Sequence, residues 1–341
     1  MILFEHDSKC AAYWFAAEEY IMKVLRPVEP VLMLWSTEDT IMVGANQVVR
    51  AECDVAYARS NGIKIVRRSS GGGAIFTDSG TLQMTVILPY LGWPQDFAPN
   101  DDEDPHNDAI DAGTIARDWL ASPIINTLAF YGAKAMIEGR NDITIDGKKI
   151  SGIAQYIKGG YILSHCSLLF HTDLEKLAKC LTADREKFTT KALASVRARV
   201  TNVAGFIEES NMKNFCNTLI ETSGARRVKF ESGAVSAIDT IMREKYLNPD
   251  WTFGREPAFT FTNAKRFSGG RVEVFLDVKG GVIKEAHISG DFLSLLPVCE
   301  LEAKLTGVAH RADALAEMLQ TIDVRACLGS LSAAELLEVL L

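Results

Sequence analysis

The stretch RRSSGGGAIFTDSG, residues 67–80, places three consecutive glycines between an Arg-Arg-Ser-Ser segment and a short apolar run. Each ordered glycine costs roughly 0.5–1 kcal/mol relative to alanine. A tight turn between two strands, the simpler alternative, needs only one or two residues with positive φ. The stretch therefore favours a loop whose bare backbone lies against a ligand. We expect Arg67 and Arg68 to supply charge to that ligand, and Ser69 and Ser70 to supply hydroxyl donors.

The glycine loop does not match the common phosphate-binding motifs. A Walker loop ends in Gly-Lys-Ser or Gly-Lys-Thr, which GGGAIF lacks. A dinucleotide fingerprint needs another glycine three residues after Gly73, and that position is Phe76. The loop alone therefore predicts a ligand site without naming the ligand.

The composition is that of a globular protein with room for two domains. The chain has 341 residues, of which 48% are hydrophobic and 23% are charged. Its net charge is −8. A general nucleic-acid binder needs a basic surface to neutralise phosphates, so we expect no nucleic-acid partner.

The cysteines and the N-terminus indicate a reducing, aqueous compartment. The seven cysteines are odd in number and none forms Cys-x-x-Cys, which argues against a disulfide framework or a zinc site. The N-terminal MILFEHDSKC lacks a basic n-region and an apolar h-region. No apolar run approaches the ~20 residues that span a bilayer. We expect a cytoplasmic protein without a membrane partner.

Hydrophobic spacing predicts alternating helices and strands over the first 250 residues. The predicted helices are 11–25, 52–60, 109–131 (which Pro123 could interrupt), 208–222 and 234–246, and the predicted strands are 31–35, 40–44, 63–66 and 82–88. The acidic, proline-containing stretch 94–108 reads as a solvated loop, with metal binding as the alternative.

Residues 135–170 alternate like several strands, and Asp146-Gly147 is a hairpin turn signal. The TDLE stretch at 172–175 is a capping-box pattern. Turn residues at 248–259 indicate a linker, and a second domain starts near residue 257.

A second polar cluster, GRNDITIDGKKISG, spans residues 139–152. A hairpin there would bring Asn141 and Asp142 back towards Lys148 and Lys149. A lysine ammonium is a compact charge that can lie between a carboxylate and a phosphate. The alternative is that both lysines merely flank a turn. Basic residues at 185–199 could likewise contact phosphate or form a solvated face.

Together these motifs resemble the lipoate–protein ligase family. The family pattern reads RRSSGGGA at 67–74, GRND at 139–142 and KISG at 149–152, in the same order and at similar spacing, with SVRARVTN at 195–202 as a further family segment. The resemblance implies a mixed-sheet α/β catalytic domain of the biotin/lipoate ligase type over residues 1–250. It also implies a small α+β accessory domain over residues 257–341.

The resemblance implies ATP, Mg²⁺ and lipoate as reactants, with lipoyl-AMP as the intermediate. Lys149 is the expected catalytic residue, in contact with both the carboxylate and the α-phosphate. Asn141 and Asp142 are expected to orient the lysine or the adenylate, and the alternative for Asp142 is a magnesium ligand. The expected ATP and adenylate site comprises Arg68, Ser70, Gly71, Gly72, Gly73, Ala74, Ile75, Phe76, Asn141, Asp142 and Lys149.

The resemblance also assigns a lipoate site to Gly72, Gly73, Lys149 and His165. An apolar tunnel is expected for the lipoyl tail, since burying each CH₂ contributes about 0.8 kcal/mol. The implied partners are lipoyl-acceptor domains, either the E2 subunit of 2-oxoacid dehydrogenases or the H protein of glycine cleavage.

Three departures from the family pattern bear on substrate breadth and rate. They are Thr77-Asp78 in place of His-Asp, Gly80-Thr81 in place of Gly-Asn, and His165-Cys166 in place of His-Gly. The alternatives are an ATP-independent lipoyl or octanoyl transferase, a biotin–protein ligase, or a non-catalytic lipoyl-binding protein. The cysteine-type transferase carries its nucleophile just before the motif that aligns with GRND, and residues 130–138 contain none.

Overall fold

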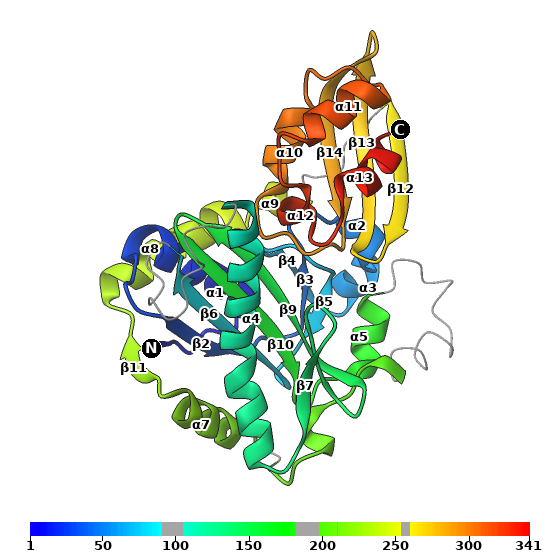
Figure 1. Cartoon of the computed structure of the whole chain (residues 1–341). Helices are drawn as coiled ribbons and strands as arrows, with labels where there is room; N and C mark the ends of the chain where they lie inside the picture. Colours follow the sequence, from blue (N-terminus) through cyan, green and yellow to red (C-terminus); the bar gives the residue numbers. More distant parts are fainter. Residues whose placement is uncertain (91–104, 182–197, 210, 254–259) are drawn as a thin grey trace.

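A computed structural model of the chain describes residues 1–90, 105–181, 198–209, 211–253 and 260–341 (Figure 1). A large sheet organises the N-terminal part. Its strands, in spatial order, are β11 (Arg226–Lys229), β1 (Ile2–Glu5), β2 (Val31–Trp35), β6 (Thr81–Pro89), β10 (Tyr161–Leu169), β9 (Lys148–Lys158), β8 (Asp142–Ile145) and β7 (Ala135–Glu138). The β1 strand pairs in parallel with β11 and β2, and the remaining pairs are antiparallel.

Helices cover both faces of this sheet, which explains why its central strands are buried along nearly their whole length. On one face lie α4 (Pro105–Phe130) and α7 (Met212–Ser223), packed on side chains such as Met84 and Cys166. On the other lie α1 (Ala11–Tyr20), its π-helical continuation η1 (Ile21–Leu25), α8 (Ser232–Ile241) and η4 (Met242–Tyr246). Because strand side chains alternate in direction, Gln83 and Ser167 face the α1 side.

A smaller sheet carries the glycine loop. Its order is β4 (Lys64–Arg67), β3 (Thr40–Val43) and β5 (Ile75–Thr77), and the glycines connect β4 to β5. Around it lie α2 (Val49–Glu52), α3 (Val55–Ser60) and α5 (Leu174–Cys180), which share an apolar cluster with the sheet. The short elements η3 (Val203–Gly205) and α9 (Pro249–Phe253) complete the N-terminal part.

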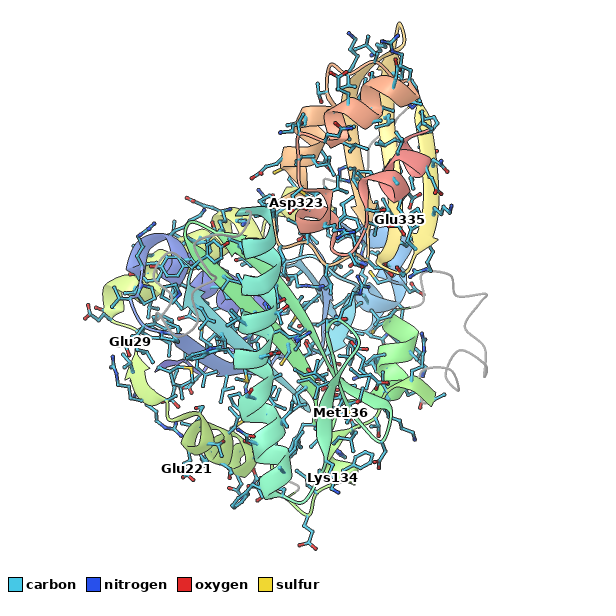
Figure 2. All side chains as sticks on the ribbon, viewed as in Figure 1. Glu29, Lys134, Met136, Glu221, Asp323 and Glu335 are labelled. Atoms are coloured by element: carbon cyan, nitrogen blue, oxygen red, sulfur yellow. The ribbon has the colours of Figure 1, made fainter. Side chains whose placement is uncertain are left out.

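The C-terminal part has a sheet and a core of its own. Strands β12 (Phe261–Phe267), β13 (Gly270–Lys279) and β14 (Val282–Gly290) form an antiparallel sheet. Helices α10 (Val298–Leu305), α11 (Ala312–Leu319), α12 (Val324–Leu328) and α13 (Ala333–Leu340) pack on it. Figure 2 shows Glu335 on α13, where its side chain completes a capping box with Ser332.

Three predictions made from the sequence can be compared directly with the structure. The Asp146-Gly147 turn between β8 and β9 is confirmed, with φ of 51° and 70°. A break at Pro123 is wrong: α4 continues through it, because Leu120 and Ile124 are fully buried on the sheet and that packing offsets the lost backbone bond. The capping box at 172–175 is also wrong, since α5 is capped by Asp173.

Other predictions fall partly outside the described residues. The acidic loop at 94–108 is described only from residue 105, where α4 begins. The linker at 248–259 contains α9, and its residues 254–259 are not described. Of the helices in the described ranges, none is long and apolar enough to cross a membrane.

Candidate active site

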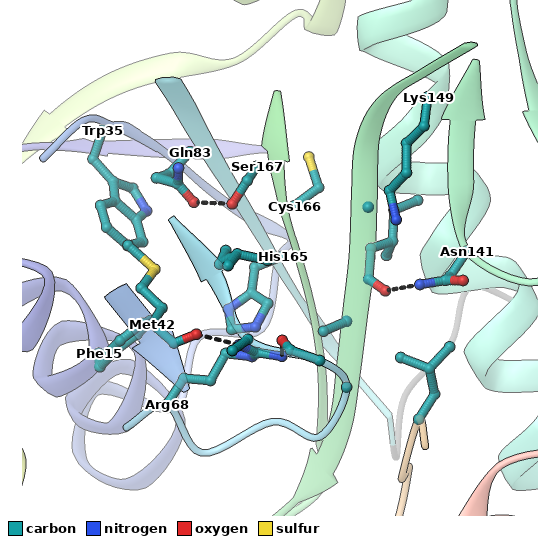
Figure 3. Close-up of a pocket in the computed structure, with 18 residues that line it drawn as sticks. Phe15, Trp35, Met42, Arg68, Gln83, Asn141, Lys149, His165, Cys166 and Ser167 are labelled. Carbon is teal, nitrogen blue, oxygen red and sulfur yellow. Dashed lines mark hydrogen bonds between the residues drawn. The ribbon is translucent and has the colours of Figure 1, made fainter. Parts of the chain in front are cut away.

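The glycine loop faces the β8–β9 hairpin across a cavity of about 160 Å³, here called the inner cavity (Figure 3). Its lining includes many of the residues that the sequence singled out: Arg68, Gly72, Gly73, Ala74, Ile75, Asn141, Lys149 and His165. A larger outer cavity of about 920 Å³ adjoins it and is lined by Phe76, Asp142 and again by Ile75 and Lys149. Lys149 therefore borders both cavities.

Arg68 is built into the glycine loop. Its Nη2 donates to the carbonyls of Gly71 (2.7 Å) and Gly73 (2.8 Å), and its Nε donates to Ser70 Oγ (3.0 Å). Burial, together with the neighbouring charge of Arg67, lowers the pKa of Arg68 to about 10. These bonds hold the loop around the guanidinium, so the three consecutive glycines adopt one defined conformation.

The C-terminal domain lies against the outside of the glycine loop. The Gly72 N–H donates to the Phe292 carbonyl (2.8 Å), and a Cβ on Gly71 would lie 2.6 Å from Ser294 Oγ. Gly72 has a φ of +86°, which also favours glycine. Leu293 reaches past the loop to line the inner cavity. The backbone is therefore approached by a segment of the same chain, which the sequence did not suggest.

A buried relay of side chains fixes the His165 ring. His165 Nδ1 lies 3.1 Å from Glu18 Oε1, and its Nε2 lies 2.6 Å from Ser70 Oγ. The Glu18 carboxylate also accepts from Thr85 Oγ1 at 2.8 Å. Ser70 thus contacts the histidine and Arg68 rather than the cavity, and its hydroxyl holds the loop to the sheet.

The hairpin presents Lys149 and Asp142 as an ion pair, with Nζ 2.7 Å from Oδ1. The two side chains are 37% and 35% exposed, so both remain accessible to a ligand. A Cβ on Gly152 would lie 2.9 Å from Lys149 Nζ. The glycine of the Lys-x-Ser-Gly motif therefore leaves room for the ammonium.

Asn141 ties the start of the hairpin to β9. Its side-chain amide donates to the backbone carbonyl of Ile153 (3.0 Å), and its backbone carbonyl accepts from the backbone N–H of Ile153 (2.7 Å). These bonds set the position of β8 relative to β9. The residue therefore orients the strand from which Asp142 projects.

The basic segment predicted at 185–199 falls mostly outside the described residues, which omit 182–197. The part that follows borders the outer cavity, where Ala198, Arg199 and Val200 contribute to the lining. The Thr201 N–H donates to the Lys149 carbonyl at 3.0 Å. This places the end of the segment directly beside the hairpin.

Cys166 does not have the environment of a nucleophile. The residue borders the inner cavity, but its side chain packs in the core on the α4 face, with Met84 and Ile153. Burial raises the pKa of its thiol to about 12, which keeps it protonated near neutral pH. A cysteine-based acyl transfer has no support from this residue.

Metal-ligand groups are sparse across the described ranges. No cluster of three or more histidine, cysteine or carboxylate side chains there could hold a metal ion. Asp142, which is paired to Lys149, and its cross-strand neighbour Glu138 are the carboxylates among the described residues that line the outer cavity. This donor set suits Mg²⁺ only if substrate oxygens complete its shell, which is how Mg²⁺ usually binds with nucleotides.

Comparison with known proteins decides the family. The model of the lipoyl protein ligase A/B catalytic domain matches residues 10–223, and that of the bacterial lipoate protein ligase C-terminus matches residues 256–340. The lipoate-protein ligase LplJ of Bacillus subtilis is 30% identical over 333 residues, which cover 95% of each chain. The chain belongs to the lipoate–protein ligase family.

Solved structures agree with this family in fold. LipL1 of P. falciparum, solved in complex with lipoate, matches with a TM-score of 0.73 over 94% of both chains at 19% identity. The bi-partite lipoate protein ligase of Thermoplasma acidophilum, described with its E2 lipoyl domain, matches with a TM-score of 0.64 at 26% identity, over 76% of this chain and 98% of that one. The predicted mixed α/β ligase fold with a C-terminal domain is confirmed.

Several residues that line the inner cavity had no signal in the sequence. They are Phe15, Trp35, Met42, Gln83, Ser167 and Leu293. The strand containing Trp35 was predicted, but the register that brings it to the cavity is set by pairings over long sequence distances. Leu293 comes from the second domain, and no local pattern signals that contact.

Proposed function

We propose that the protein is an ATP-dependent lipoate–protein ligase that forms lipoyl-AMP and then transfers the lipoyl group to a lysine of an acceptor domain. The observation that carries the proposal is the position of Lys149 on the border between the inner and outer cavities. We assign the lipoyl tail to the inner cavity and the nucleotide to the outer one. The carboxylate and the α-phosphate then meet at the ammonium.

The first half-reaction needs no protein nucleophile. A carboxylate oxygen of lipoate attacks the α-phosphorus of ATP, the new O–P bond forms, and the bond to the pyrophosphate oxygen breaks. Lys149 Nζ donates to the carboxylate and to the α-phosphate, where it offsets the charge that develops on phosphorus. The ion pair with Asp142 keeps the Lys149 ammonium in this position. Mg²⁺, carried by the phosphates and by Asp142, would supply further charge neutralisation.

The second half-reaction uses the amine of the acceptor. The ε-amine of its lysine attacks the lipoyl carbonyl, an amide bond forms, and AMP leaves with the bonding electron pair while the amine loses its proton. We propose E2 lipoyl domains or the H protein of glycine cleavage as acceptors. The first is supported by the T. acidophilum relative, which is described with its E2 lipoyl domain.

The remaining side chains are assigned from their places in the structure. Gly73, Ala74, Ile75 and Phe76 run from the inner cavity to the outer one, as a bound adenylate requires. Arg68 Nη1 donates one bond, to the Met42 carbonyl at 3.2 Å, and carries a second N–H that we assign to a phosphate oxygen.

The lipoyl group is assigned to the inner cavity. His165, Gly72 and Gly73 would line it. The Gly72 N–H reaches a substrate only after its bond to Phe292 breaks, and the same displacement of the C-terminal segment would uncover Gly71. Ser70 would act indirectly, by holding Arg68 and His165 in place.

The test is pyrophosphate release with ATP, Mg²⁺ and lipoate in the absence of an acceptor. The proposal predicts release that requires lipoate and that persists in Cys166→Ser. A parallel reaction supplies an octanoyl-carrier thioester without ATP. Acyl transfer in that reaction, with no pyrophosphate release in the first, would replace the ligase by a transferase. Lipoate binding without either reaction would leave a binding protein.

A further inference from the structure

A row of side chains crosses five strands of the large sheet beneath the inner cavity. Strand pairing places Trp35 opposite Gln83, Gln83 opposite Ser167, Ser167 opposite Gly152, and Gly152 opposite Asp142. Residues that pair directly across strands project from the same face of a sheet. The row therefore runs from the ion pair of Asp142 and Lys149 to the indole of Trp35.

The spacing between strands gives the distance of each side chain in the row from Gly152, which can be compared with the length of the acyl tail. Neighbouring strands lie about 4.8 Å apart, so Ser167, Gln83 and Trp35 stand about 5, 10 and 14 Å along the row from Gly152. Lys149 Nζ lies over Gly152, where the carboxylate is proposed to bind. An extended eight-carbon acid is about 9 Å long from its carboxyl carbon to its last carbon. Its far end thus arrives at Gln83.

Gln83 presents an unused donor at this point. It is 3% exposed, and its Oε1 accepts from Ser167 Oγ at 2.6 Å (Figure 3). Its Nε2 is buried and has no hydrogen-bond partner among the described residues. Buried amide donors are nearly always paired, so an unpaired one in the lining of a cavity calls for an explanation.

The two eight-carbon acids that fit this length differ in what they offer the amide. Lipoate carries two sulfurs, on its sixth and eighth carbons, and such sulfurs are weak hydrogen-bond acceptors. Octanoate ends in methylene and methyl groups, which accept nothing and would cover the amide without pairing it. Leaving a buried donor unpaired is costly relative to pairing it, even weakly.

We propose that the Gln83 carboxamide, oriented by Ser167, is a specificity-determining group that selects lipoate over octanoate by donating to a dithiolane sulfur. This inference rests on the proposed function, because it places the carboxylate of the acid at Lys149. It gives the unpaired amide a partner and explains why a buried polar side chain lines the cavity beside the indole of Trp35.

The test compares lipoate with octanoate in acceptor-free pyrophosphate release by wild type and Gln83→Met, which keeps the length of the side chain and removes its donor. Wild type is expected to favour lipoate in kcat/KM by about tenfold, and Gln83→Met is expected to bring the ratio close to one. The change should appear in KM, because the tail is held alike before and during the reaction. Gln155→Met is the matched control, since that amide is paired to Gly113 and Ser164 and does not line the inner cavity.

Ser167→Ala provides a second variant if Gln83→Met does not fold. It removes the bond that orients the amide and should lower the lipoate preference in part. An unchanged ratio in a folded Gln83→Met or Ser167→Ala, or a wild type that prefers octanoate, overturns the inference and leaves the ligase function standing. A wild type that releases no pyrophosphate with either acid overturns the proposed function itself, and the inference with it.

Discussion

The two sides of the inner cavity carry their positive charge in opposite ways. On the glycine-loop side, Arg67 and Arg68 are 1% and 4% exposed, and their N–H groups bind backbone carbonyls. On the hairpin side, Lys149 is 37% exposed and paired to one carboxylate. A buried guanidinium with several fixed acceptors shapes the protein, whereas an accessible ammonium can change partners during a reaction.

The comparison separates stability from chemistry. Arg67 Nη1 donates to the carbonyls of Gly44 and Gln47, both at 2.7 Å, and so fastens the end of β4 to the segment that follows β3. The hairpin side contributes few bonds of that kind around Lys149. We therefore expect substitutions on the two sides to fail in different assays.

The largest expected effect is on the hairpin side. Lys149→Ala should reduce pyrophosphate release about 10²–10³-fold, because the charge on the transferring phosphorus loses its nearest cation. Its free energy of unfolding should stay within about 0.5 kcal/mol of wild type, as for other accessible side chains. Lys148→Ala, one residue away and exposed, is the control and should retain activity. Equal losses of activity in Lys149→Ala and Lys148→Ala would show that Lys149 has no special role in the reaction.

Next in size is the loop side. Arg68→Met should lower the free energy of unfolding in urea by about 3 kcal/mol, since several buried carbonyls lose their donor at once. Arg59→Met, on the exposed surface of α3, is the matched control, with an expected change within about 0.5 kcal/mol. If Arg68→Met were as stable as that control and lost only activity, Arg68 would serve the phosphate alone and would not hold the glycine loop.

A smaller effect is expected at Gly152, where the absence of a side chain leaves room for the Lys149 ammonium. Gly152→Ala should slow pyrophosphate release about tenfold, because the new Cβ would lie 2.9 Å from Lys149 Nζ and displace it. Gly205→Ala adds the same methyl group where nothing lies within 4 Å. Thermal unfolding of both variants should resemble wild type. Full activity in Gly152→Ala would show that the lysine acts from another position.

The smallest effect concerns the support behind the loop. Burial alone would raise the pKa of Glu19, but hydrogen bonds from Lys23, Lys245 and Tyr246 outweigh it and lower the pKa from 4.5 to about 2. The charged form is thus favoured by folding. Its contribution to stability is complete above pH 4.5 and is lost as the pH falls towards 2.

Glu19→Gln isolates this contribution from other carboxylates. The variant should be less stable than wild type by about 1 kcal/mol at pH 7, allowing for solvent screening. The difference should shrink between pH 4.5 and pH 2 in urea denaturation followed at each pH. A difference that is constant with pH would assign the effect to packing instead of charge.

The sequence was informative wherever a local signal matched the final geometry. The Asp146-Gly147 turn predicted the hairpin, and the hairpin predicted that Lys149 would return to Asp142. Both follow from short-range rules on turns and strand alternation. The fold class followed from the order of several motifs, not from any one of them.

What the sequence could not reveal depends on long-range placement. The charge of Arg67 was evident, but its burial was not, since it depends on carbonyls from Gly44 and Gln47. The row through Gln83 requires the register of several strands at once. The contact of Phe292 with Gly72 joins two domains, so neither segment alone signals it.

The most direct measurement is mass-spectrometric detection of lipoyl-AMP in a single turnover with ATP, Mg²⁺ and lipoate but no acceptor. We expect the adenylate to accumulate on wild type, Lys149→Ala to form almost none, and Lys148→Ala to form a normal amount. Lipoyl-AMP at wild-type levels in a folded Lys149→Ala, or none in an active wild type, would contradict this expectation.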